Sequence, residues 1–286
     1  MGIKEICREI GIKPNFLLAS DRDIFAKKVY VKNFNPKLFL CSDFKFLIDY
    51  DADDNLLMSS DLNVLKSKID LFLAGPPCEG NSNLNNKTRG NDPRNNLFFD
   101  ILNVAVTLDA KLIILENVPQ IINDKDEAIN KSLAVLKLKG YDYQTIKVKA
   151  CEFGVAQSRE RFFLVASKKL NFLIKNQLEL LKLKKINVSQ ALDYEFRKSG
   201  DFYSPSNLSD ENRKRVAYLH KNNIFNLPDS ERPDCHKLKE HNYEAVYGRM
   251  FPDKPAPTIT TGFLSPGRGR FTHPNSPRSL TPYEGA

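Results

Sequence analysis

The chain has 286 residues, 41% of them hydrophobic, which is enough for one large α/β domain and a smaller second one. Its formal net charge of +8 favours a polyanionic partner but does not distinguish nucleic acid from a Lys-rich solvated surface. No apolar run approaches the roughly 20 residues of a membrane span. The five cysteines lie far apart without a CxxC pair, which argues against a zinc cluster or a disulfide framework. We therefore expect a cytoplasmic protein without a bound metal.

Hydrophobic spacing predicts helices and strands that alternate up to about residue 166. In chain order the predicted elements are a helix over 2–11, a strand over 16–21, a helix over 23–33, strands over 38–41 and 70–74, a helix over 96–108, a strand over 111–116, a helix over 127–139, and strands over 143–149 and 161–166. This order indicates an α/β fold with a doubly wound, mostly parallel sheet.

After this series the sequence becomes rich in Lys, Asn and Pro, and its predicted elements are short and irregular. We predict three segments: a first domain over residues 1–180, a smaller irregular domain over 181–265, and a return to the first domain over 266–286.

Four predicted strands end in polar or reactive residues. These residues are Asp21, Asp43, Pro77 with Cys78, and Glu116 with Asn117. Because ligands of doubly wound sheets bind beyond the carboxyl ends of the strands, we expect these side chains to face one crevice.

Cys78 is the candidate nucleophile of that crevice. Two prolines stiffen the chain before it, and the backbone N–H groups of a turn could stabilise its thiolate. The alternative is an inert buried thiol, which is the usual state of cysteine. Cys78 considered alone does not decide between them.

Glu116 ends the apolar strand KLIILE, and its carboxyl group could protonate a ring nitrogen or accept a hydrogen bond from an exocyclic amine. A helix cap or a surface acid is the alternative. Asp21 and Asp43 could bind the ribose hydroxyls or the adenine amine of a nucleotide cofactor. They could equally be loop acids, since no Gly-rich phosphate loop accompanies them.

Gln157, Arg159 and Arg161 alternate along a strand edge in the run EFGVAQSRERFFLVAS, so all three side chains are expected on one face. An amide and two guanidinium groups suit an anionic partner. The alternative is a solvated strand face.

Taken together, these motifs resemble the cytosine-5 DNA methyltransferase family. GPPCEGNS is similar to the catalytic proline-cysteine loop and DPRNNLFF to the helix start that follows it. LENV resembles the Glu-Asn-Val strand end and QSRER the Gln-x-Arg-x-Arg strand. YGRMFPDKPAPTITT and GRFTHPNSPRSLTPYE resemble the segments that close the recognition domain. The resemblance extends over nearly the whole chain.

The resemblance implies the S-adenosylmethionine-dependent methyltransferase fold, with a catalytic domain over 1–180 and a target-recognition domain over 181–265. It implies that a cytosine is flipped out of double-stranded DNA, that Cys78 attacks C6, and that Glu116 holds N3 and the amino group. S-adenosylmethionine would supply the methyl group. Arg159 and Arg161 would hold the cytosine O2 and phosphates. Asn117 would brace the Pro77-Cys78 backbone, and Gln157 would also support the site.

The other residues that the resemblance assigns fall into two groups. Those expected to bind the cofactor are Asp21, Asp43, Phe44, Pro77 and Leu97. Those expected to contact DNA are Ser82, Arg89, Arg94, Thr260 and Thr261. The resemblance also implies an enzyme of the restriction-modification type. A cognate restriction endonuclease is then a possible partner. We expect the protein to be monomeric unless a second chain completes it.

Three departures from the family pattern are visible. The first Gly-rich motif of the family would precede Met1, and the sequence ends within the ninth motif. We therefore expect weak cofactor binding and little or no activity from this chain alone. Arg22 stands where the family usually has a bulky apolar residue. The alternatives are an inactive DNA-binding remnant and one part of a split methyltransferase; the Cys-Phe-Thr signature of the tRNA-methylating branch is absent.

Overall fold

A computed structural model describes residues 2–43, 46–51, 56–77, 96–123, 127–169, 174–192, 200–237 and 244–286. Its strands are β1 (Leu18–Ser20), β2 (Leu38–Leu40), β3 (Ile48–Tyr50), β4 (Leu56–Met58), β5 (Leu71–Ala74), β6 (Leu112–Asn117), β7 (Asp142–Lys149) and β8 (Glu160–Ser167). Its α-helices are α1 (Gly2–Glu9), α2 (Ile24–Phe34), α3 (Ser60–Asn63), α4 (Asn96–Thr107), α5 (Ala128–Leu138), α6 (Ile174–Leu180), α7 (Val188–Leu192), α8 (Asp210–Lys221), α9 (Asp234–Lys237) and α10 (Pro282–Gly285).

The largest sheet among the described residues has four strands in the order β5-β6-β8-β7. β5 and β6 are parallel, whereas β8 is antiparallel to both β6 and β7. β1 and β2 form a separate parallel pair, and β3 and β4 form an antiparallel pair. The predicted α/β class is confirmed, with antiparallel strands at one side of the main sheet.

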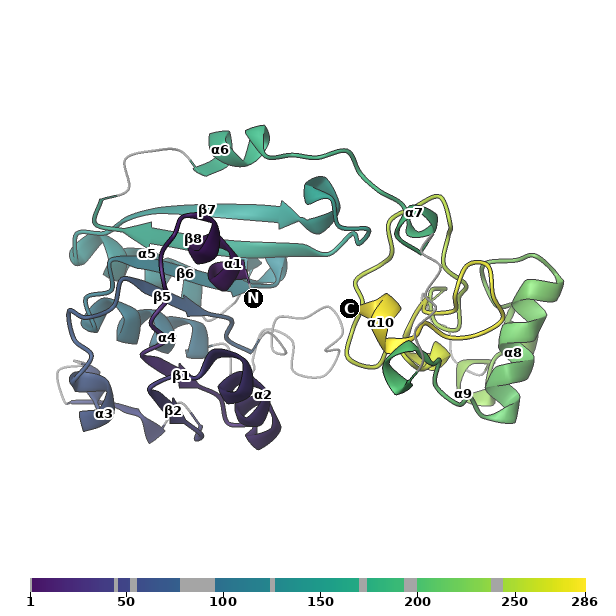
Figure 1. The fold of residues 1–286 in the computed structure, drawn as a ribbon, viewed down its shortest axis with the longest axis horizontal. Helices are drawn as coiled ribbons and strands as arrows, with labels where there is room; N and C mark the ends of the chain where they lie inside the picture. Colours follow the sequence, from purple (N-terminus) through teal and green to yellow (C-terminus); the bar gives the residue numbers. More distant parts are fainter. Residues whose placement is uncertain are drawn as a thin grey trace.

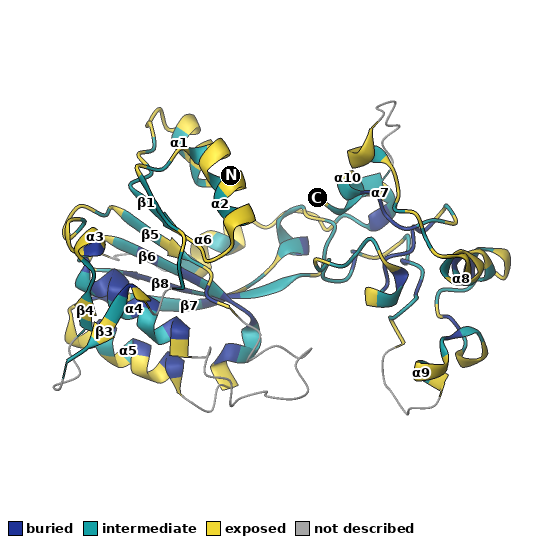
Figure 2. Cartoon of the chain, turned by 90° about the horizontal axis from the view of Figure 1, so that it is seen from below, coloured by how far each residue is buried: buried dark blue, intermediate teal, exposed yellow. Residues whose placement is uncertain are grey.

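The main core lies on one face of this sheet, where α4 and α5 pack (Figure 2). Alternate residues of the strands point into it, among them Ile113 and Leu115 of β6 and Phe162 and Leu164 of β8. Because side chains of a strand alternate between faces, the residues between them point to the opposite side. α1 and α2 lie on that opposite side (Figure 2).

A smaller cluster connects the two-stranded sheets to the main sheet. Leu18 of β1 and Leu40 of β2 pack with Phe72 of β5 around buried Leu62 and Val104. The ends of β1 and β2 therefore belong to the same body as the end of β5.

Residues from α7 to the C-terminus gather in a second lobe, which Figure 1 shows beside the lobe that contains the sheets. Its apolar cluster contains Val188, Met250, Ala256, Phe271 and Leu280. The segment 266–286, predicted to return to the first domain, thus contributes Phe271 and Leu280 to the core of the second lobe.

Two further observations apply to the described part of the chain. No helix there has the length and apolar character needed to cross a membrane. The same residues contain no group of three or more His, Cys, Asp or Glu side chains that could hold a metal ion.

Candidate active site

Glu116 and Asn117 are the last two residues of β6, and the strand alternation sends them to opposite faces. Ile113, Leu115 and Asn117 are buried, with Asn117 only 2% exposed. Glu116 points to the face away from the main core, and its side chain is 32% exposed to solvent. The sheet thus presents one carboxyl group beside the end of β5.

Arg161 meets Glu116 because of the pairing between β6 and β8. Glu116 lies directly opposite Phe163, so Arg161, two residues away along β8, is its diagonal neighbour on the same face. The Arg161 Nε lies 2.7 Å from the Glu116 Oε1, and the Arg161 side chain is 18% exposed. An Arg161 terminal nitrogen also donates to the carbonyl oxygen of Glu160 at 2.8 Å, which restrains the guanidinium group.

Asn117 connects β6 to the turn that follows β5. Its side-chain nitrogen donates to the carbonyl oxygen of Pro76 at 3.4 Å. Its side-chain oxygen accepts the backbone N–H of Val118 at 2.8 Å, so both polar atoms of this buried amide have partners. Asn117 therefore holds the backbone of the Pro76-Pro77 turn, directly before Cys78.

Cys78 lies outside the described residues, as do Phe44, Ser82, Arg89 and Arg94. The described chain reaches Pro77, which is exposed and follows buried Pro76. The structure therefore places the approach to Cys78 next to Glu116 and Asn117.

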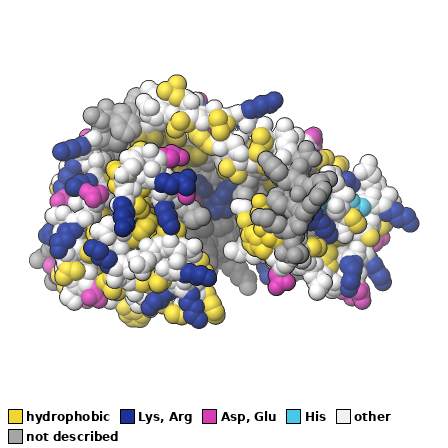
Figure 3. All heavy atoms as spheres, in the orientation of Figure 1, with side chains coloured by type: hydrophobic (Ala, Val, Ile, Leu, Met, Phe, Trp, Pro, Cys, Tyr) yellow, Lys and Arg dark blue, Asp and Glu magenta, His cyan; other side chains and the backbone are white. Residues whose placement is uncertain are grey.

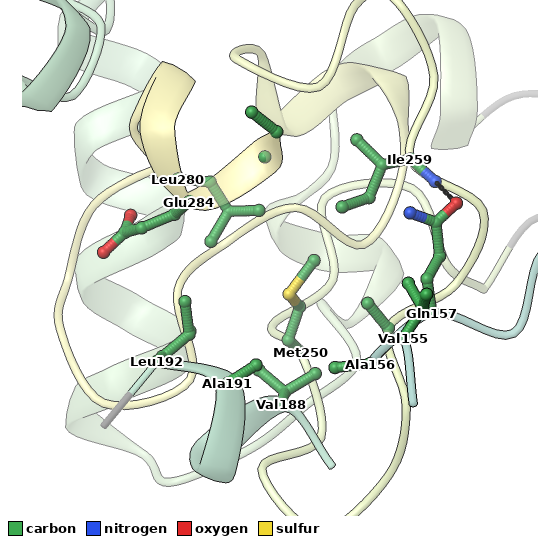
Figure 4. A pocket seen from close by; sticks show the side chains of 13 residues that line it. Val155, Ala156, Gln157, Val188, Ala191, Leu192, Met250, Ile259, Leu280 and Glu284 are labelled. Carbon is green, nitrogen blue, oxygen red and sulfur yellow. Dashed lines mark hydrogen bonds between the residues drawn. The ribbon is translucent and has the colours of Figure 1, made fainter. Parts of the chain in front are cut away.

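Gln157 does not share a strand face with Arg161, because β8 begins only at Glu160. Residues 156–158 instead pair with Ala256: the Ala256 N–H donates to the Ala156 carbonyl at 2.8 Å, and the Ser158 N–H donates to the Ala256 carbonyl at 2.8 Å. The Gln157 side-chain oxygen accepts the backbone N–H of Ile259 at 3.2 Å (Figure 4). This pairing connects the start of β8 to the segment just before Thr260 and Thr261.

Arg159 is partly exposed in the connection before β8, and its carbonyl oxygen accepts the Ala150 N–H at 2.8 Å. Thr260 is partly buried and its carbonyl accepts the Phe263 N–H at 3.1 Å, whereas Thr261 is exposed.

A cavity of about 170 Å³ lies beside Gln157 and is walled mainly by apolar side chains, including those of Val188, Met250 and Leu280 (Figure 4). None of the described residues predicted to bind the cofactor contributes to its wall. The cavity is therefore separate from the predicted cofactor site.

The described residues predicted to bind the cofactor lie at the ends of β1 and β2 and at the start of α4. Asp21 follows β1 and is exposed; one of its carboxylate oxygens accepts the Asp23 N–H at 2.8 Å. Asp43 follows β2 and is partly exposed. Since β1 and β2 are parallel, the two acids lie at the same edge of that pair. Leu97, in the first turn of α4, is 8% exposed.

Basic side chains are spread over the first lobe, and some border the hollow between the two lobes (Figure 3). This distribution is compatible with a polyanion that contacts both lobes.

Two features of this site did not follow from sequence reasoning. One is the pairing of residues 156–158 with Ala256, for which local periodicity carries no signal. The other is Gly75: a Cβ atom placed there would lie 3.3 Å from the Glu116 Oε2. The only sequence signal for the role of Gly75 was its place between the end of a predicted strand and two prolines.

Comparison with known proteins supplies the family. The family model of C-5 cytosine-specific DNA methylases matches residues 7–286. The type II methyltransferase M1.BsuMI of Bacillus subtilis (strain 168) is 41% identical over 289 residues, which cover 100% of this chain and 68% of that protein. The type II methyltransferase M.DdeI of Desulfomicrobium norvegicum is 25% identical and covers 95% of this chain and 72% of its own length.

Two solved structures share the fold at low identity. A DNA modification methyltransferase encoded within an E. coli prophage has a TM-score of 0.59 at 23% identity, covering 94% of this chain and 80% of that one. The Dnmt2 methyltransferase of S. pombe has a TM-score of 0.53 at 17% identity, covering 92% of this chain and 68% of that one.

Proposed function

Because the chain belongs to the C-5 cytosine-specific DNA methylase family, we propose that it methylates cytosine in DNA through Cys78 and Glu116. The observation that carries this assignment of residues is the juxtaposition at the end of β6. There the Glu116 carboxylate and the Asn117 amide adjoin the turn that leads into Cys78. The extended match to type II methyltransferases favours an enzyme over a non-catalytic DNA-binding remnant.

In the proposed reaction the target cytosine is flipped out of the duplex, since its ring cannot be reached inside the stack. The Cys78 thiolate forms a bond to C6, which makes C5 a carbon nucleophile. Glu116 holds N3 and the amino group and stabilises the charge that develops there. Once C5 carries the methyl group, loss of the C5 proton and cleavage of the bond between Cys78 and C6 restore the aromatic ring.

The surrounding residues have supporting roles in this proposal. Arg161, which binds Glu116 in the structure, orients that carboxylate and contacts the cytosine O2 or a phosphate together with Arg159. Asn117 braces the Pro76-Pro77 backbone. Gln157 holds the segment before Thr260 and Thr261, which are proposed to contact the DNA backbone.

The chain's donor set fits the cofactor of the family. Asp21 and Asp43 offer carboxylate oxygens at the same edge of the β1–β2 pair, as the ribose hydroxyls and adenine amine of S-adenosylmethionine require. Phe44, Pro77 and Leu97 are proposed to provide apolar contacts. Bound there, S-adenosylmethionine supplies an electrophilic methyl group.

We propose that residues 1–180 form the catalytic domain, 181–265 the target-recognition domain, and 266–286 the return toward the catalytic domain. Phe271 and Leu280 of this segment pack in the second lobe, so the support for a return comes from its end, where Glu284, Gly285 and Ala286 line the same cavity as residues 155–157. Double-stranded DNA would then lie between the lobes, with Ser82, Arg89 and Arg94 as further contacts. As a monomeric type II enzyme it would work in the cytoplasm beside a cognate restriction endonuclease.

Mechanism-based trapping tests the role of Cys78. Long PCR products made with 5-fluorocytosine contain every short target sequence, so the unknown target site is no obstacle. S-adenosylmethionine is supplied in large excess, which offsets weak cofactor binding. The protein should then form a covalent complex with this DNA, because fluorine at C5 blocks the last step. Denaturing gel electrophoresis detects the complex.

Cys78→Ala should abolish the complex, whereas Cys235→Ala, which removes an exposed thiol of the second lobe, should leave it unchanged. A covalent complex that persists in Cys78→Ala would refute the proposed nucleophile.

A further inference from the structure

Gly75 directly follows β5 and lies beside the Glu116 carboxylate. In the parallel pairing of β5 and β6, Ala74 is opposite Leu115, so the next residues, Gly75 and Glu116, continue the same register. A Cβ atom built on Gly75 would lie 3.3 Å from the Glu116 Oε2, and no other described atom outside its chain neighbours lies within 4 Å. A side chain at this position would therefore meet the carboxylate.

The opposite side of the carboxylate is already occupied. The Glu116 Oε1 is bound by the Arg161 Nε at 2.7 Å, and Arg161 is itself restrained by the Glu160 carbonyl oxygen. The carboxylate thus lies between a guanidinium group and the bare backbone of Gly75. A Cβ atom at position 75 would make an unusually tight contact with the carboxylate, which would have to shift by a few tenths of an ångström.

We infer that Gly75 is a positioning residue: its missing side chain sets where the Glu116 carboxylate stands relative to the Pro76-Pro77 turn and, one residue further, Cys78. This inference rests on the proposed function, because it matters only if Glu116 contacts the flipped base while Cys78 attacks it. Two groups that act on the same small ring tolerate little change in their separation, and misplacement by 1 Å can cost about a hundredfold in rate.

The backbone does not require glycine at this position. Gly75 does not have a positive φ angle. Among the described glycines, those that do are Gly11, Gly140, Gly154, Gly200 and Gly269. Alanine at position 75 is therefore not strained in itself, and a loss caused by Gly75→Ala reports the contact with Glu116.

Gly75→Ala should lower the single-turnover rate of covalent trapping about tenfold while the affinity for DNA and the thermal midpoint stay unchanged. Gly2→Ala is the matched control, because a Cβ there meets nothing within 4 Å. Its rate should equal that of the wild type. A wild-type rate in Gly75→Ala would overturn the inference.

A double-mutant cycle separates this effect from a general loss of structure. Glu116→Asp withdraws the carboxylate by one methylene group, so the added methyl group of Gly75→Ala no longer meets it. In the Glu116→Asp background, Gly75→Ala should therefore cost less than about twofold. An equal cost in both backgrounds would show that Gly75 acts independently of Glu116. Excess enzyme and long incubation make slow variants measurable.

The same assay keeps the two hypotheses apart. If trapping does not depend on Cys78, the proposed function fails. If trapping depends on Cys78 but is insensitive to Gly75→Ala, only the positioning role fails.

Discussion

Asn117, the last residue of β6, has a buried side chain whose two polar atoms are both hydrogen-bonded. It is 2% exposed, donates to Pro76 and accepts from Val118. A carboxylate of the same shape could not do both, since it has no N–H to donate. This residue therefore couples the stability of the sheet to the position of the turn before Cys78.

Asn117→Asp should lower the free energy of unfolding by about 2–3 kcal/mol, because it places a carboxylate oxygen against the Pro76 carbonyl in a buried position. Urea denaturation measures the change. Asn33→Asp is a suitable control, because Asn33 is exposed and donates to the Val29 carbonyl at 2.7 Å. It should cost less than about 1 kcal/mol. Equal losses at both positions would contradict this account.

Helix α2 follows β1 and begins at the loop that carries Asp21. Asp23 is its N-cap, and one carboxylate oxygen accepts the N–H groups of Phe25 at 2.6 Å and Ala26 at 3.3 Å. Asp21 in turn accepts the Asp23 N–H. The start of α2 and the orientation of Asp21 thus depend on the same short network.

Asp23→Ala should destabilise the protein by about 1 kcal/mol, the usual cost of removing a bonded N-cap side chain. Ser59→Ala provides the contrast. Ser59 is the N-cap of α3 but makes no side-chain capping bond, and its buried hydroxyl oxygen has no partner in the described structure. Its removal should leave thermal stability unchanged or slightly raised. A larger loss for Ser59→Ala than for Asp23→Ala would contradict this view of the caps.

At the scale of the whole molecule, two apolar clusters are joined by the pairing of residues 156–158 with Ala256. Figure 2 shows buried residues in both lobes, but among the described residues most of the buried polar and charged side chains lie in the second lobe, including Arg232, Arg270 and Thr272. Polar networks therefore contribute more to the packing of the second lobe than to that of the first. One such network is formed by His273, Arg278 and Glu284.

The His273 ring is 9% exposed, and its Nδ1 accepts the N–H groups of Asn275 and Ser276, both at 3.0 Å. Burial, followed by the charge of Arg278, lowers the pKa of His273 from 6.5 to about 4. Protonation would also sacrifice the two bonds at Nδ1. Arg278 meanwhile binds both carboxylate oxygens of Glu284 at 2.7 Å.

Stability should therefore fall as the pH drops below 6.5, because the unfolded chain takes up a proton at this position and the folded chain does not. Well above pH 6.5, His273 is neutral in both the folded and the unfolded state, so it no longer makes the free energy of unfolding depend on pH. Between pH 7 and pH 5 the loss attributable to His273 should be about 2 kcal/mol. His273→Gln should flatten the stability profile over this range. An unchanged slope in the variant would exclude His273 as its cause.

Local periodicity was sufficient to locate most elements of the first lobe. The predicted helix over 127–139 is α5 (Ala128–Leu138), and the predicted strand over 161–166 is β8 (Glu160–Ser167). The α/β class followed from the order of these elements. The pair β3–β4 was missed, because each strand has only three residues and an acidic stretch separates them. β1 and β2 are equally short, but each lies in a longer apolar run, over residues 16–19 and 38–41, that can be recognised from the sequence.

The chemistry-bearing residues were found from their places at strand ends, but the partners of Arg161 and Gln157 were not. Arg161 was expected to face an anionic ligand and contacts Glu116, because the register of β6 and β8 makes them diagonal neighbours. Gln157 was expected on the same face and binds Ile259, 102 residues away in the chain. Whether a segment forms a strand depends on nearby residues, whereas register and pairing depend on distant contacts that burial of the whole core selects. The partners of Glu116 and Gln157 therefore emerged only with the folded chain, whereas the resemblance had already directed Asn117 to the proline turn that its amide binds.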